Sequence, residues 1–140
     1  MLKGKVLGLD YGQKRIGLAI GDLEQKIAVP KGFLIIKKHK EALQKIKKLC
    51  LENQIVLIVL GLPYLLDRQE TKTTQKIKQF GEVLAKKTQI KVNFMDETLS
   101  TFEAEESMSN FKKDKKDKTS GERDCLSAAI ILERWFKGKF

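Results

Sequence analysis

The chain has 140 residues, with 28 Lys or Arg against 18 Asp or Glu, and its formal net charge is +10. A chain of this length fits one domain, residues 1–140, that buries roughly two-thirds of its unfolded surface. Such a basic surface attracts polyanions, so nucleic acid is the expected partner, and no apolar run approaches the ~18 residues of a membrane span. Cys50 and Cys125 lack the neighbours that a zinc site needs. We therefore expect a soluble cytoplasmic protein with two reduced, buried thiols.

The first third of the chain predicts three strands. Apolar runs over Lys5–Tyr11 and Arg15–Gly21 flank Gly12-Gln13-Lys14, which indicates a tight hairpin whose glycine can adopt a positive φ. A third strand is expected at Gly32–Ile36, after Pro30. Three short strands before any helix favour an antiparallel meander.

The middle of the chain alternates helices with strands. Ile55–Leu60 is an unbroken apolar run ended by Gly61-Leu62-Pro63, which predicts an interior strand, and Ile90–Met95 predicts the fifth. Apolar residues at three- and four-residue spacing predict a helix before each of these two strands. These residues are Ala42, Leu43, Ile46, Leu49 and Cys50 in the first helix and Thr73, Ile77, Phe80 and Leu84 in the second.

The C-terminal part predicts two further helices. Ser100 and Glu103 fit a capping box that would begin a short helix running to about Met108. The charged stretch from Asn110 to Gly121 predicts a mobile loop. The last helix is expected to begin near Thr119 or Ser120 and to end at about Phe136. The element order βββαβαβ followed by helices predicts an α/β fold.

Acidic residues stand where these elements begin or end. Asp10 ends the first strand, Asp96 and Glu97 follow the fifth, and Asp124 opens the last helix. Carboxylate oxygens are the ligands that Mg²⁺ and Mn²⁺ prefer. If one fold gathers these acids at one metal, the sequence predicts a magnesium-dependent nuclease.

Each acid also has a plainer explanation. Asp10 could be a turn aspartate that bonds the turn backbone, and the other acids could offset helix dipoles. Gly12 and Gly17 instead leave room near Asp10 for a phosphate backbone, with Arg15 as a possible bidentate phosphate contact. Strand alternation points Asp96 and Glu97 in opposite directions, so only one of them should reach a shared metal.

Asp124 is expected to face the core. Residues 124, 128, 131 and 135 share one helical face, and they are Asp124, Ala128, Ile131 and Trp135. The small Ala128 would let the helix approach the sheet closely. That approach would place the carboxylate near the strand ends instead of in solvent.

Four motifs resemble those of one nuclease family. They are Asp10-Tyr11-Gly12-Gln13-Lys14-Arg15-Ile16-Gly17-Leu18-Ala19, Gly61-Leu62-Pro63, Asp96-Glu97-Thr98-Leu99-Ser100-Thr101 and Asp124-Cys125-Leu126-Ser127-Ala128-Ala129. From Lys5 to Trp135 the chain is similar to the YqgF family, also called RuvX, of Holliday-junction resolvases or pre-rRNA nucleases. The resemblance implies an RNase H-like fold. In that fold a five-stranded mixed sheet, three antiparallel strands followed by βα units, carries helices on both faces.

The resemblance also implies site residues. Asp10, Glu97 and Asp124 would be the metal ligands and catalytic acids, with Mg²⁺ or Mn²⁺ as cofactor. The expected nucleic-acid contacts are Lys14, Arg15, Thr101 and, in the charged loop, Lys112, Lys113, Lys115 and Lys116. The residues expected to shape the site are Gly12, Gly17, Gly61 and Pro63. Thr98 and Arg68 depart from the family pattern, which has an arginine and a glycine there, but neither is a proposed ligand.

The implied activity is metal-dependent phosphodiester hydrolysis, most of all in 5′-end processing of pre-16S rRNA, with the small ribosomal subunit as a further expected partner. The first alternative is cleavage of four-way DNA junctions, which needs a symmetric dimer, whereas a monomer can trim an RNA end. A second alternative is a binding protein for ribosome assembly or junctions that turns over nothing. A third is a nucleotide-phosphate loop like that of actin-like ATPases, and the absence of a second lobe in 140 residues argues against it.

Overall fold

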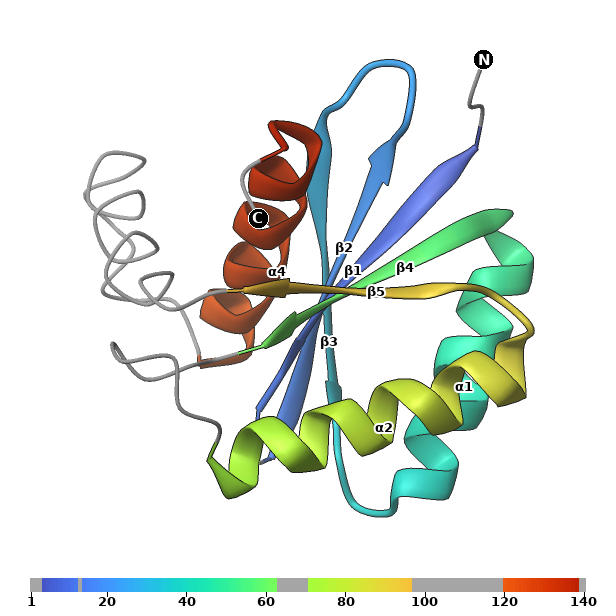
Figure 1. The fold of residues 1–140 in the computed structure, drawn as a ribbon, viewed down its shortest axis with the longest axis vertical. Helices are drawn as coiled ribbons and strands as arrows, with labels where there is room; N and C mark the ends of the chain where they lie inside the picture. The colour runs from blue at the N-terminus through green and yellow to red at the C-terminus, as the bar shows by residue number, and fades with distance from the viewer. Residues whose placement is uncertain (1–3, 13, 63–70, 97–119, 139–140) are drawn as a thin grey trace.

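The computed structural model describes residues 4–12, 14–62, 71–96 and 120–138, with the backbone alone described for residues 120–124. A five-stranded mixed sheet in the order β3-β2-β1-β4-β5 carries helices on both faces (Figure 1). The elements are β1 (Lys5–Tyr11), β2 (Arg15–Asp22), β3 (Ala28–Ile35), α1 (His39–Glu52), β4 (Ile55–Leu62), α2 (Lys72–Thr88), β5 (Val92–Asp96) and α4 (Ser120–Phe136). The predicted α/β fold is confirmed.

The strand directions bring three strand ends to one edge of the sheet. β1 is antiparallel to β2 and parallel to β4, and β4 is parallel to β5. The carboxyl ends of β1, β4 and β5 therefore lie side by side, which is where open α/β sheets generally bind ligands. The acids at the ends of β1 and β5 belong to this edge.

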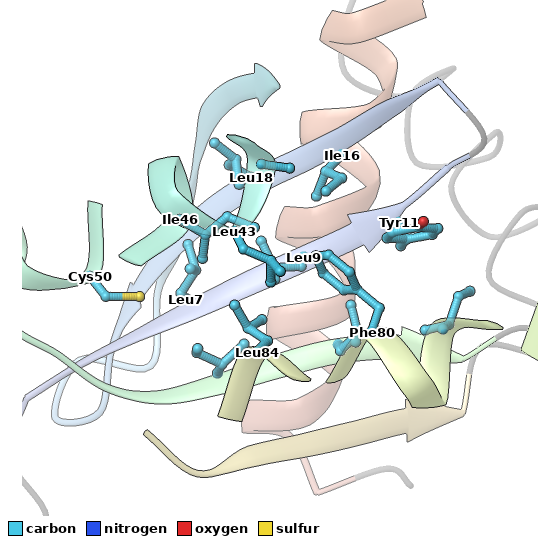
Figure 2. Packing of buried hydrophobic residues seen from close by; sticks show 14 of the residues in the cluster. Leu7, Leu9, Tyr11, Ile16, Leu18, Leu43, Ile46, Cys50, Phe80 and Leu84 are labelled. Carbon is cyan, nitrogen blue, oxygen red and sulfur yellow. The ribbon is translucent and has the colours of Figure 1, made fainter. Parts of the chain in front are cut away.

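Strand alternation divides the side chains of β1 between two hydrophobic layers. Leu7, Leu9 and Tyr11 pack beneath α1 and α2, as Figure 2 shows. Val6 packs in the second layer, which α4 covers with Ala128, Ile131 and Leu132. Because successive side chains point to opposite faces, Asp10 lies on the α4 face with Val6.

The first helices form because their apolar faces meet this sheet. In α1 the buried residues are Ala42, Leu43, Ile46 and Cys50, and in α2 they are Thr74, Ile77, Phe80, Gly81 and Leu84. Thr71 caps α2, since its side chain accepts a hydrogen bond from the Thr74 backbone N–H at 3.1 Å. The predicted spacing is confirmed in both helices except at Thr73, which is exposed, while its neighbour Thr74 is buried because its side chain joins the N-cap of α2.

Strand β3 differs from the prediction, because it begins at Ala28 and not at Gly32. Pro30 lies inside the strand, which is possible because β3 is at the sheet edge and a proline there loses no ladder hydrogen bond. The register shifts between the pairs Gly17–Phe33 and Ala19–Pro30, where β3 holds one extra residue and Gly32 has a φ of +93°. This bulge reverses which face the following residues of β3 occupy.

Several further predictions are confirmed and others fall outside the described residues. Cys50 and Cys125 are buried and are not joined in a disulfide, and α4 begins at Ser120 and ends at Phe136 as expected. The expected helix from Ser100 to Met108, and residues 110–119 of the expected loop, are outside the described residues. Within the described ranges, no helix combines the length and apolar character needed to cross a bilayer.

Candidate active site

Asp10 is a half-buried residue, the second-last of β1, just before the hairpin. Its ladder partner is Gly17 of β2, so Asp10 lies inside the strand and not in the turn itself. A turn aspartate does occur at the other end of the sheet, where the Asp22 carboxylate accepts hydrogen bonds from the Glu24 and Gln25 N–H groups at 2.8 and 3.1 Å. Asp10 thus differs from Asp22 in that its backbone belongs to the strand ladder.

Helix α4 packs closely on β1 because Gly8 leaves room for it. A Cβ at Gly8 would lie 2.5 Å from Leu132 Cγ and 3.1 Å from the Ala128 carbonyl oxygen. A Cβ at Gly21, whose partner in β1 is Val6, would lie 2.7 Å from the Phe136 ring. The earlier part of α4 thus lies over Gly8, and its end lies at the level of Val6. Because Val6 precedes Gly8 in β1, α4 runs antiparallel to β1.

This direction carries the first turn of α4 towards Asp10. Asp124 precedes Ala128 by four residues, or about 6 Å of helix rise. Asp10 follows Gly8 by two residues, or about 7 Å of strand. The backbone of Asp124 and Asp10 thus lie towards the same end of the sheet. The expected core face of α4 is confirmed for Ala128 and Ile131, which are 0% and 1% exposed, while the Asp124 side chain is outside the described residues.

At β5 the structure separates Asp96 from Asp10. Met95 is buried in the layer under α4, and Gly61 is its partner in β4. Asp96 pairs with Leu62, whose side chain belongs to the opposite layer under α1 and α2. Asp96 therefore lies on the face away from Asp10. Glu97, the next residue, is outside the described residues.

The hairpin between β1 and β2 is tight, but the reason for its glycine differs from the prediction. The Gly12 N–H donates to the Arg15 carbonyl oxygen at 2.8 Å, and the φ of Gly12 is not positive. A Cβ on Gly12 would lie 2.9 Å from that same carbonyl oxygen, so close backbone approach explains the glycine. Lys14 is exposed and Arg15 is half-buried at the start of β2.

The remaining predicted residues fall into two groups. Gly17 and Gly61 lie in β2 and β4 at the level of Asp10 and Met95, where their backbone is buried. The structure therefore places Asp10, Gly12, Lys14, Arg15, Gly17 and Gly61 at one edge. Pro63, Arg68, Thr98, Thr101 and the four loop lysines Lys112, Lys113, Lys115 and Lys116 are outside the described residues.

Behind Asp10, on the other face of the sheet, Tyr11 anchors an aromatic cluster. Its hydroxyl lies 2.8 Å from His39 Nε2. Its ring lies 4.8 Å from that of Phe80, centroid to centroid, and Figure 2 shows these two residues together. Burial raises the pKa of Tyr11 above its ordinary value, so the phenol is neutral near pH 7. No sequence pattern pointed to His39, because it is 28 residues from Tyr11 and on another element.

A pocket opens beside this cluster at the start of α2. Its volume is about 210 Å³, and it is lined by Tyr11, Gly12, Lys72, Thr73 and Lys76. Lys72 and Lys76 are one helical turn apart, so their side chains lie on the same face of α2. The pocket therefore adds two positive charges next to the hairpin that follows Asp10.

The metal site predicted from the three acids lies partly outside the described side chains. Among them, no three His, Cys, Asp or Glu residues gather closely enough to hold a metal ion. Asp10 is the only member of the predicted trio whose side chain is described. The donor chemistry itself fits a hard divalent cation, because carboxylates are its preferred protein ligands.

Comparison with known proteins identifies relatives of the whole chain. A family model described as "RuvX: Holliday junction resolvase" matches residues 4–138. Three curated relatives carry the name "Putative pre-16S rRNA nuclease". The protein from Hydrogenovibrio crunogenus is 37% identical over 96% of this chain and 94% of its own, and that from Clostridioides difficile is 35% identical over 99% and 98%. The protein from Orientia tsutsugamushi is 33% identical over 97% of this chain and 85% of its own.

Solved structures agree on the fold. Thermus thermophilus RuvC in complex with a Holliday junction substrate superposes with a TM-score of 0.63 at 14% identity, covering 97% of this chain and 95% of RuvC. The fowlpox virus resolvase, complexed with Holliday junction DNA, superposes with a TM-score of 0.61 at 14% identity, covering 96% and 97%. Both have the RNase H-like fold, and this chain shares it.

Proposed function

Because the chain belongs to the RuvX family, we propose that it is a divalent-metal-dependent nuclease that hydrolyses phosphodiester bonds of nucleic acid. The catalytic and metal-binding acids in this proposal are Asp10, Glu97 and Asp124. The observation that carries it is the position of Asp10, a half-buried carboxylate at the end of the central strand, on the face and towards the end where α4 begins. One domain, residues 1–140, carries the proposed site.

Strand alternation supports the inclusion of Glu97 among these acids. Met95 lies in the layer under α4, and continued alternation would return Glu97 to that face, the face of Asp10. Three carboxylates would bind Mg²⁺ or Mn²⁺. A bound ion would neutralise charge on the scissile phosphate and help activate the attacking water.

The other proposed residues position the substrate. Arg15 and Lys14, at the start of β2, contribute positive charge that holds phosphate groups near Asp10. Gly12 and Gly17 present backbone without side chains beside that carboxylate, while Gly61 and Pro63 shape the end of β4. Further phosphate contacts in the proposal come from Thr101, Lys112, Lys113, Lys115 and Lys116.

The proposed substrate is the 5′ region of pre-16S rRNA, by analogy with the relatives named for that reaction. The small ribosomal subunit is then a candidate partner, and two cysteines that form no disulfide are in keeping with a cytoplasmic location. The second candidate is a four-way DNA junction. It is favoured by the description of the family model and by the fold shared with two junction-bound resolvases.

Cleavage assays test the proposal directly. A labelled pre-16S 5′ leader and a labelled four-way junction are incubated with the protein in Mn²⁺, in Mg²⁺ and in EDTA. Asp10→Asn keeps the side-chain size but lowers the ability to bind a cation, and Asp22→Asn is the matched control at the other end of the sheet. Asp22→Asn should cleave like the unmodified protein, because an asparagine oxygen can still accept the hydrogen bonds of that turn.

The outcomes separate the candidates. Metal-dependent cleavage of the RNA, lost in Asp10→Asn alone, supports the proposed nuclease and its substrate. Cleavage of the junction by a dimer supports the second candidate, since two symmetric cuts need two sites. Binding of either substrate without cleavage in any metal would overturn the nuclease and favour a binding protein.

A further inference from the structure

Strand β3 leaves two large apolar side chains exposed on the same face of the sheet as Asp10. Phe33 is 38% exposed and Ile35 is 57% exposed. β3 is an edge strand, and α4 covers the face at its Ala28 end, where Ala28, Trp135 and Phe136 all pack against the same apolar layer. The Phe33 and Ile35 end of the strand extends beyond that layer. We call these two residues the β3 platform.

The register connects the β3 platform to the acid. Asp10 pairs with Gly17, and Gly17 pairs with Phe33, so the three residues form one row across β1, β2 and β3. Paired residues point to the same face, and strands lie about 4.8 Å apart, which separates the Cα atoms of Asp10 and Phe33 by about 10 Å. That distance corresponds to about three nucleotides of a stacked strand. Gly17, in the middle of the row, has no side chain to stand between them.

The bulge in β3 is what brings Phe33 onto this face. Val29 pairs with Ile20, whose side chain lies in the layer under α1 and α2. Val29 and Phe33, four residues apart, would share a face in a regular strand. The extra residue at Gly32 places them on opposite faces. Val29 is therefore an exposed side chain of the same strand on the opposite face, and it can serve as an internal control.

The charges around the platform favour nucleic acid over an apolar protein partner. Arg15 is the ladder partner of Ile35 and precedes Gly17 by two residues, so it belongs to the same face. Lys14 is exposed next to it. An aromatic ring flanked by cations is the pattern by which proteins hold single strands, with bases stacked on the ring and phosphates held by the basic groups.

We propose that the β3 platform is a stacking site for an unpaired nucleobase of the substrate strand, a few nucleotides from the bond that is cut. The proposal rests on the nuclease function proposed above and adds a substrate class to it. A single-stranded segment can stack a base on Phe33, whereas paired bases in a duplex cannot leave their own stack without cost. The protein should therefore prefer single-stranded segments at this position.

Binding measurements test the β3 platform without relying on cleavage. The probes are a single-stranded RNA 12-mer, an abasic strand of equal length and charge, and a duplex of the same sequence, titrated in Ca²⁺ to limit cleavage. Phe33→Ala should weaken binding of the 12-mer about tenfold and leave binding of the abasic strand unchanged, because aromatic stacking is worth about 1–3 kcal/mol per base. Val29→Ala, at a residue 46% exposed on the opposite face, should change neither.

A fluorescent variant gives a second readout. Phe33→Trp should keep the affinity, and its indole emission should be quenched by the 12-mer but not by the abasic strand. Val29→Trp should show no base-dependent quenching. Far-UV circular dichroism of each variant confirms that the fold is retained, as expected for exposed positions.

The outcomes distinguish this proposal from the nuclease itself. If Phe33→Ala binds the 12-mer as well as the unmodified protein does, while the unmodified protein still cleaves RNA, the stacking site is wrong and the nuclease stands. Equal weakening for the 12-mer and the abasic strand would also overturn stacking. Base-dependent binding through Phe33, with no cleavage in any metal, would support the stacking site and overturn the nuclease.

Discussion

Gly8 of β1 and Ala128 of α4 are in such close contact that a single Cβ at Gly8 would lie 3.1 Å from the Ala128 carbonyl oxygen. Both residues are small, and Ala128 is fully buried. Their contact sets how near α4 approaches the central strand. Because Asp10 follows Gly8 by two residues and Asp124 precedes Ala128 by one turn, the same contact determines the separation of two proposed catalytic acids.

Gly8→Ala should therefore reduce both stability and activity. The added methyl meets Leu132 Cγ at 2.5 Å, and Leu132 is fully buried, so α4 must shift outward. Overpacking of this kind costs about 1–3 kcal/mol of unfolding free energy, measured by urea denaturation. Cleavage should fall further than the folded fraction does. Leu51→Ala, at a residue 73% exposed on α1, is the control and should change neither property. An unchanged denaturation midpoint for Gly8→Ala would mean that α4 is not held at Gly8.

The pocket at the start of α2 should contribute to nucleic-acid binding through charge. Lys72→Ala and Lys76→Ala should each weaken binding of single-stranded RNA uniformly across sequences. Each should reduce the slope of log K against log salt concentration by about 0.7, the value for one phosphate contact with a single strand. Lys86→Ala is the matched control, since Lys86 is exposed on the same helix about 21 Å from Lys72. Equal slopes for all three variants would show that the pocket is not part of the surface that binds RNA.

Cys50 should make the protein less stable at alkaline pH. Burial raises the pKa of its thiol from 9.0 to about 11. The unfolded chain then loses this proton at lower pH than the folded chain, so the associated stability is present below about pH 9 and is lost as pH rises through about 11. The free energy of unfolding, measured by urea denaturation, should fall less between about pH 8 and about pH 10.5 for Cys50→Ala than for the unmodified protein. An equal fall in the two proteins would mean that the Cys50 thiol has the same pKa in the folded and the unfolded chain.

Much of the fold could be predicted from the sequence, because hydrophobic periodicity reports directly on which face of an element is buried. The unbroken apolar run in β4 required an interior strand, and the Ala128 and Ile131 spacing in α4 required a core face. Strand β3 was predicted too short, because Pro30 usually marks an interruption. An edge strand tolerates proline, and whether a strand lies at an edge is decided by the whole sheet.

Strand ends and family motifs predicted where the candidate site lies. They did not predict the local contacts within it. Strand alternation predicted that only one of Asp96 and Glu97 could share a metal with Asp10, and the structure places Asp96 on the other face. A positive φ at Gly12 was wrong, because the constraint comes from the Arg15 carbonyl oxygen across the hairpin. The contact of Tyr11 with His39 and the bulge that turns Phe33 towards the Asp10 face depend on tertiary packing and strand register. Neither leaves a periodic signal in the chain.

The first experiment to carry out is cleavage of labelled RNA by Glu97→Gln and by Asp96→Asn, side by side in Mn²⁺, because it tests whether the acids meet on the α4 face of the sheet. The two acids are adjacent in sequence, and Asp96 lies on the face opposite Asp10. We expect Glu97→Gln to abolish cleavage while the folded protein still binds RNA, and Asp96→Asn to cleave like the unmodified protein. Loss of cleavage in Asp96→Asn with activity retained in Glu97→Gln would contradict it, because the acids would then meet on the other face of the sheet.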